Sequence, residues 1–233
     1  MKLRIIAGAV ALTSTGVLAL SSSLLASPNY NGCKSSASAG VDWSGCKKIA
    51  KYLQEKDLRG ANFERTNLSR TNLMKAKLNK ARLRRADISK AILRQADLSG
   101  ANLEKAVGMR AYMDGAKLRS ANLQKIELYR AQLQAADLSN ANLIGAQLGR
   151  TNLSGAKLLG ANIKYANLAR ADLRSASVEG ADFTSAYFFR TRLEGVDLSA
   201  AKGLSQVQLD LACGDTKTAL PDGLKPGQQW PCH

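Results

Sequence analysis

Residues 96–105 read ADLSGANLEK, two copies of a five-residue unit that decides the fold. An apolar residue recurs every five positions from Leu58 to Leu198, without an insertion or deletion. Of the 30 unit centres up to position 203, 28 are Leu, Ile, Val, Met or Phe, and the exceptions are Gly108 and Gly203. Alanine lies two residues before 23 of these 30 centres. A period of five fits neither a helix nor a strand, so the pattern predicts a repeat architecture.

The repeats resemble those of the pentapeptide-repeat family, whose motif is A(D/N)Lxx, over roughly 150 residues. This resemblance implies an all-β solenoid, a right-handed quadrilateral β-helix in which four pentapeptides form one square coil. In that fold the central residue and the residue two before it point inward, and the other three face solvent. Because stacked coils repeat at about 4.8 Å, the chain is expected to form about seven to eight coils in a rod about 35 Å long.

The chain divides into four predicted segments. Short helical caps are expected at both ends, since open solenoid ends promote association. At the N-terminal end, Ile49, Tyr52 and Leu53 lie at helical spacing and predict a helix over residues 46–56. The segments are a signal peptide (1–26), an N-terminal flank with its capping helix (27–56), the β-helix (57–203), and a C-terminal capping helix with a disulfide-closed tail (204–233).

The C-terminal capping helix has a clear start in the sequence. Ser205 and Gln208 have the spacing of a capping box, and Leu204 with Leu209 has that of a hydrophobic staple. Gly214 is the expected end of this helix.

Residues 1–26 have the features of a secretory signal. Lys2 and Arg4 precede an apolar run that ends at Leu20, and small polar residues follow. Cleavage is expected after Ala26; cleavage after Ser21 or Ser23, and an uncleaved anchor, are the alternatives. The protein is therefore predicted to be exported, as a periplasmic or secreted protein.

Four cysteines lie outside the repeats. In the rod that the resemblance implies, two lie near each end, much further apart than the about 7 Å between Cα atoms that a bridge tolerates. The expected disulfides are therefore Cys33–Cys46 and Cys213–Cys232, and similar segments flank the repeats of secreted bacterial members of the family. A metal site is not expected, because neither pair has CxxC spacing and the only histidine is the terminal His233.

The formal net charge of the chain is +16, of which Lys2 and Arg4 would be lost with the signal. Family members that protect DNA gyrase from quinolones are strongly acidic and imitate DNA. The opposite sign of charge, together with export, makes a gyrase-binding DNA mimic the least favoured interpretation of this chain.

Reading the repeats in steps of twenty shows which outward residues stack on each wall of the coil. The four walls are numbered in chain order from the pentapeptides centred on Leu58, Phe63, Leu68 and Leu73. One position, two residues after the centre on the third wall, is basic in every coil. Its members, here called the basic column, are Arg70, Lys90, Arg110, Arg130, Arg150, Arg170 and Arg190. The same position on the second wall begins with Arg65, Arg85, Lys105 and Lys125. These residues form either a solubilising surface or a one-dimensional track for anions, to which Met109, Tyr129 and Phe189 would add apolar contacts.

Two other columns are predicted to be structural. Residues before the centre on the first wall alternate in charge, from Asp57 and Lys77 onward, and predict a ladder of salt bridges. On the second wall, stacked asparagines predict an amide ladder, formed by Asn102, Asn122, Asn142 and Asn162.

No residue pattern indicates catalysis, a cofactor or a small-molecule substrate. We therefore expect a non-catalytic exported scaffold or binding module that presents a basic wall to an anionic polymer, an acidic protein or an anionic membrane surface. The alternative is a purely structural protein with a solubilising surface. Export disfavours nucleic acid as a natural partner, and two capped ends favour a monomer or weak homodimer. Gly108 leaves either a small void or a local bulge.

Overall fold

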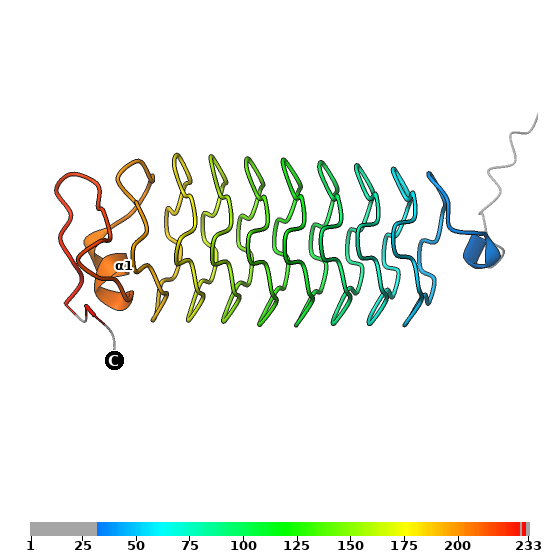
Figure 1. The fold of residues 1–233 in the computed structure, drawn as a ribbon, viewed down its shortest axis with the longest axis horizontal. Coiled ribbons are helices and arrows are strands. Elements are labelled where there is room, and N and C mark those ends of the chain that lie inside the picture. The colour runs from blue at the N-terminus through cyan, green and yellow to red at the C-terminus, as the bar shows by residue number, and fades with distance from the viewer. Residues whose placement is uncertain (1–31, 229, 232–233) are drawn as a thin grey trace, which may run out of the picture.

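The computed structural model describes residues 32–228 and 230–231 and shows a rod of stacked coils (Figure 1). Parallel bridges join residues twenty positions apart, as between Asn102 and Asn122. Each pentapeptide contributes one such bridge residue, so that four pentapeptides complete one coil with four walls. No helix of the described ranges has the length and apolar character needed to cross a membrane. The predicted signal peptide and its cleavage sites lie outside the described residues.

Every pentapeptide contains a tight turn that begins at its central residue. The Ala111 N–H donates to the Gly108 carbonyl at 3.1 Å, which closes one such turn. From Gly40 to Gly195 the residue two after the centre has positive φ, as Arg110 does at 57°, and the third residue of a type II turn shares this feature. Between coils, backbone donors and acceptors pair, as in the 2.7 Å bond from Leu98 N to Lys117 O.

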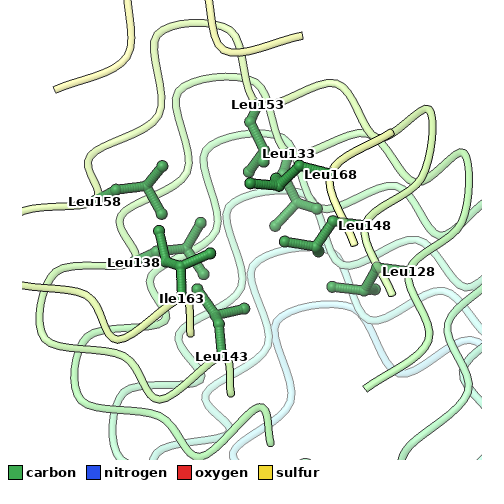
Figure 2. A pocket seen from close by; sticks show the side chains of 9 residues that line it. All are labelled: Leu128, Leu133, Leu138, Leu143, Leu148, Leu153, Leu158, Ile163 and Leu168. Atoms are coloured by element: carbon green, nitrogen blue, oxygen red, sulfur yellow. The ribbon is translucent and has the colours of Figure 1, made fainter. Parts of the chain in front are cut away.

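The core consists of the inward residues that the five-residue period predicts. From Leu58 to Leu198, leucines at the centres and alanines two residues before them are almost wholly buried. Figure 2 shows central residues from all four walls directed toward one another inside the rod. The space between them is lined by leucine and isoleucine alone, so it offers no polar partner to a ligand or a water molecule.

The coil at Gly108 is regular, with neither a void nor a bulge. Val107 still bridges to Glu127, and the Gly108 N–H donates to the Glu127 carbonyl at 2.7 Å. A Cβ atom on Gly108 would lie 2.8 Å from Leu128 Cδ2 and 3.2 Å from Ile88 Cγ1. The side chains of the two neighbouring coils therefore fill the space that a leucine would occupy.

Replacing Gly108 with leucine is expected to lower the free energy of unfolding by about 1–3 kcal/mol, because it overpacks a filled core. Adding Leu128→Ala should recover part of this loss, since it removes the methyl group that the new side chain meets. Urea denaturation of the single and double variants measures both effects. A Gly108→Leu protein as stable as the parent would show that the space is open.

The N-terminal end differs from the prediction. Residues 46–56 form no helix; they continue the coils, with bridges from Lys47 to Asn67 and from Tyr52 to Asn72. The solenoid therefore begins near Val41 and not at residue 57. The physical reason is the period of five, because Trp43 and Leu53 are in phase with the leucine centres and are buried.

The cover of this end is built from the 3-10 helix η1 (Gly32–Lys34) and the residues after it. The Cys33–Cys46 disulfide joins this segment to the first coil, with 5.6 Å between the Cα atoms. Lys48 occupies a central position of the repeat, where its Nζ donates to the Cys33 carbonyl at 2.6 Å and lies 3.5 Å from the centroid of the buried Trp43 ring. Burial lowers the pKa of Lys48, and the charge of Lys51 adds to this shift.

At the other end lies the predicted helix, α1 (Gln206–Leu211), drawn in orange in Figure 1. Ser205 and Gln208 form the capping box, and the Ser205 N–H donates to Gln208 Oε1 at 2.8 Å. The Gln208 Nε2 group also donates to the Phe183 and Ala186 carbonyls, both at 2.9 Å. The Phe183 carbonyl also accepts from the Ala186 N–H, so the bond that Gln208 alone supplies is the one to the Ala186 carbonyl.

Gly214 does not end this helix as expected, because α1 ends at Leu211. Gly214 instead lies against the Trp230 ring, which a Cβ atom would approach to 2.5 Å. The tail thus packs over the cap, and the Trp230 Nε1 group donates to the Leu209 carbonyl at 3.1 Å. Cys213 is disulfide-bonded, but its predicted partner Cys232 lies outside the described residues, so this pairing stays a prediction.

Candidate anion-binding surface

The fold brings all seven residues of the basic column to the third wall, one per coil. Each is the third residue of its turn, and each has a φ between 52° and 59°. Neighbouring members are separated by one coil, which is about 4.8 Å along the rod. The column therefore forms a straight line of cationic side chains along the rod.

This backbone position favours glycine, since positive φ costs other residues about 1–2 kcal/mol. The other three walls use glycine there in several coils, for example Gly60, Gly145 and Gly155. The third wall has none between Arg70 and Arg190. The turn geometry therefore does not explain the choice of arginine and lysine on this wall.

The charges of the basic column are not neutralised within the described part of the chain. Nine salt bridges occur there, and each uses a lysine or arginine outside the column, as in the pair of Arg94 Nε with Asp114 at 3.0 Å. Six of the seven column side chains are exposed. Arg130 is half-buried, and its Nε is buried without a hydrogen-bond partner in the structure. The charged groups of the six exposed residues are available to an external anion.

The second-wall residues form a parallel basic run of the same geometry. Arg65, Arg85 and Lys125 have φ values of 56°, 58° and 56° and form no ion pair with any described residue. Lys105 differs, because its Nζ lies 3.2 Å from Glu104 Oε1. Because this run shares the charge and backbone of the column, it supplies matched control positions for mutagenesis.

Aromatic side chains accompany the column but not the second-wall run. The Arg130 guanidinium lies 5.4 Å from the Tyr129 ring centroid, and Arg190 lies 5.7 Å from that of Phe189. Tyr187, which the sequence patterns did not single out, stacks on Phe189 with 6.3 Å between ring centroids. Tyr129 and Tyr187 remain 40% and 49% exposed, so their rings are accessible to a partner.

The predicted salt-bridge ladder on the first wall is wrong in its pairing. Asp57 stacks over Lys77 but pairs with Arg59, and Asp137 pairs with Arg119. Hydrogen bonds from the Arg59 side chain and backbone lower the pKa of Asp57 to about 2. These aspartates accept bonds from the backbone two residues on, and neither forms an ion pair with the lysine stacked beside it.

The asparagine ladder is present in part. Asn122 Nδ2 donates to Asn102 Oδ1 at 3.3 Å, and Asn142 Nδ2 donates to Asn122 Oδ1 at 3.5 Å. Each of these side-chain oxygens also accepts a backbone N–H two residues later. The motif position therefore has a structural role.

Among residues 32–228 and 230–231, no three His, Cys, Asp or Glu side chains are grouped so that they could hold a metal ion.

Comparisons with solved structures identify similar solenoids. QnrB1, a plasmid-mediated fluoroquinolone resistance protein, is 16% identical over 82% of this chain and 92% of its own, with a TM-score of 0.54. A pentapeptide repeat protein from the thylakoid lumen of Arabidopsis thaliana is 29% identical over 40% of this chain and 66% of its own, with a TM-score of 0.40. HetL from the cyanobacterium Nostoc is a pentapeptide repeat protein involved in the regulation of heterocyst differentiation. It is 25% identical over 83% of this chain and 87% of its own, with a TM-score of 0.34.

A search of curated proteins finds no match. The family model for pentapeptide repeats matches residues 57–95, 89–124, 131–164 and 166–202, more than half of the chain. The family match and the similarity to QnrB1 imply that the solenoid is a right-handed quadrilateral β-helix. The chain therefore belongs to the pentapeptide-repeat family.

Proposed function

We propose that the protein is a non-catalytic exported binding module, in which the basic column engages an anionic partner. The observation that carries this proposal is the column itself. Seven basic residues occupy turn positions that favour glycine, and none is paired with a carboxylate of the described chain. Arginine predominates, and its planar fork suits carboxylate and phosphate groups.

Export is supported by the cysteines and by the N-terminal sequence. The Cys33–Cys46 disulfide is typical of an oxidising compartment. Residues 1–26 have the composition of a secretory signal.

A purely solubilising charge is the alternative function, and the distribution of charge argues against it. Solubility depends on net charge and not on its alignment in one column. Aligned cations about 4.8 Å apart repel one another, by nearly 1 kcal/mol per neighbour even in water. A partner that supplies negative charge along the column would remove this repulsion.

Binding to immobilised polyanions at increasing salt tests the proposed function. Polyglutamate, heparin and vesicles of anionic phospholipid represent an acidic protein, an anionic polymer and a membrane surface. At least one should bind, and the logarithm of its affinity should fall linearly with the logarithm of the salt concentration. Absence of binding to all three, or an affinity that does not change with salt, would contradict the proposal.

A further inference from the structure

The basic column contains one segment that aromatic rings flank on both sides. Two consecutive coils of the third wall have small residues, Gly149 and Ala169, directly before the column residues Arg150 and Arg170. Tyr129 lies one coil before this segment and Phe189 one coil after it. We call these two coils and their flanking rings the ring-flanked segment.

Gly149 determines how the first ring lies. A Cβ atom on this residue would be 3.0 Å from Tyr129 Cδ2 and 3.2 Å from Cε2, and Gly149 is buried. The Tyr129 ring therefore lies across the backbone of the next coil. At the other side, the nearly parallel rings of Tyr187 and Phe189 stack, with an angle of 9° between their planes.

The segment between the rings combines cations with amides. Arg150 and Arg170 are exposed and form no ion pair with a described residue. On the other edge of the same wall, Asn167 Nδ2 donates to Gln147 Oε1 at 3.3 Å. The position before the centre on this wall is acidic in two other coils, at Asp87 and Glu127. In the two coils of the segment it is an amide instead.

We propose that the ring-flanked segment binds an acidic polysaccharide that carries one carboxylate per sugar; this inference rests on the proposed anion-binding function. Arginine recognises carboxylates through two parallel hydrogen bonds, and the amides of Gln147 and Asn167 can exchange hydrogen bonds with sugar hydroxyls. The exposed rings of Tyr129 and Tyr187 offer apolar surface on which sugar rings stack. The coil repeat of about 4.8 Å is comparable to the length of one sugar in an extended chain, so such a chain can run along the column in step with the coils.

Other anionic partners fit this segment less well. A peptide made of acidic residues alone has no ring to stack on Tyr129 and Tyr187, and a membrane surface has no regular spacing to match one cation per coil. Single-stranded nucleic acid has rings and charge, but the Cys33–Cys46 disulfide indicates a compartment in which nucleic acid is not the usual polymer.

Titration of the full chain with an oligogalacturonate tests the proposal, with the methyl-esterified oligomer as the matched ligand without charge. The esterified form should bind at least tenfold more weakly. The R150G/R170G variant should lose about tenfold or more in affinity for the acidic form, and Tyr129→Ala about fivefold. The matched control R65G/R85G removes two cations at the same backbone position beside no ring, and its affinity should change less than twofold. Thermal denaturation of each variant confirms that it is folded.

The outcomes separate the two proposals. Equal binding of the acidic and esterified oligomers, or an equal loss in R150G/R170G and R65G/R85G, overturns the polysaccharide assignment. If oligogalacturonate fails but heparin, polyglutamate or oligo(dT) binds and depends on Arg150 and Arg170, the polysaccharide assignment is wrong and the anion-binding function stands. If a polyanion binds but does not depend on these arginines, only the polysaccharide assignment is overturned. If no polyanion binds the parent protein, both proposals are overturned.

Discussion

Replacing Gln208 with leucine is expected to lower the free energy of unfolding of the C-terminal coils by about 3 kcal/mol. The side chain bonds two carbonyls of the last coil, those of Phe183 and Ala186, and accepts from the Ser205 N–H. Leucine has a similar volume, but it leaves the Ala186 carbonyl and the Ser205 N–H unpaired, whereas the Phe183 carbonyl still accepts from the Ala186 N–H. Each buried unpaired group costs about 1–3 kcal/mol. Urea denaturation measures the total loss.

The neighbouring Gln206→Leu substitution is the matched control. Its amide donates to Asp210 and to the Lys225 carbonyl and accepts from the Lys225 N–H. Both bonds to Lys225 are exposed to solvent, so the loss should be under about 1 kcal/mol. Equal losses of unfolding free energy at positions 206 and 208 would show that the bonds of Gln208 to the last coil contribute no special stability.

Removing the Cys33–Cys46 disulfide is expected to cost about 3 kcal/mol, as the chain-entropy model gives for a loop of this size. The bridge spans 13 residues. Alanine suits position 46 because Cys46 occupies the inward site that alanine fills in most repeats. The C33A/C46A variant therefore isolates the loss of the cross-link.

Hydrogen exchange shows where this stability is lost. Because each coil contacts only its neighbours, faster exchange should be confined to the first coils, at the amides of Trp43 and Leu53, while Leu143 keeps its protection. A uniform loss along the rod, or no loss at all, would contradict a local role for this disulfide.

The period of five predicted most of the architecture, because the residues that recur at this period are the ones whose side chains point into the core. Leu98 and Ala101 are buried where the motif places them, and steps of twenty aligned Arg110, Arg130 and Arg150 on one wall. The C-terminal cap was also predictable, since the capping box of Ser205 and Gln208 is a local pattern.

Features that depend on contacts between distant residues were not predictable in this way. Ile49, Tyr52 and Leu53 have helical spacing, but stacking on the next coil outweighs this local preference. Lys48 covers the first coil through contacts with Cys33 and Trp43, which no motif describes. The aspartates of the first wall bond their own backbone, a choice that charge alternation alone does not reveal.

A comparison of two triple variants tests whether the basic column is the surface that binds the anionic partner. R110G/R130G/R150G removes three charges from the basic column, and R65G/R85G/K125G removes three from the second-wall run. All six residues have positive φ, so glycine should preserve or raise the thermal denaturation midpoint of both variants. The measurement is the affinity of each variant for the polyanion that the parent binds most tightly. If the basic column binds the polyanion, the column variant should lose about a hundredfold or more in affinity and the control less than about threefold. Equal losses in the two variants would show that the column is not the binding surface.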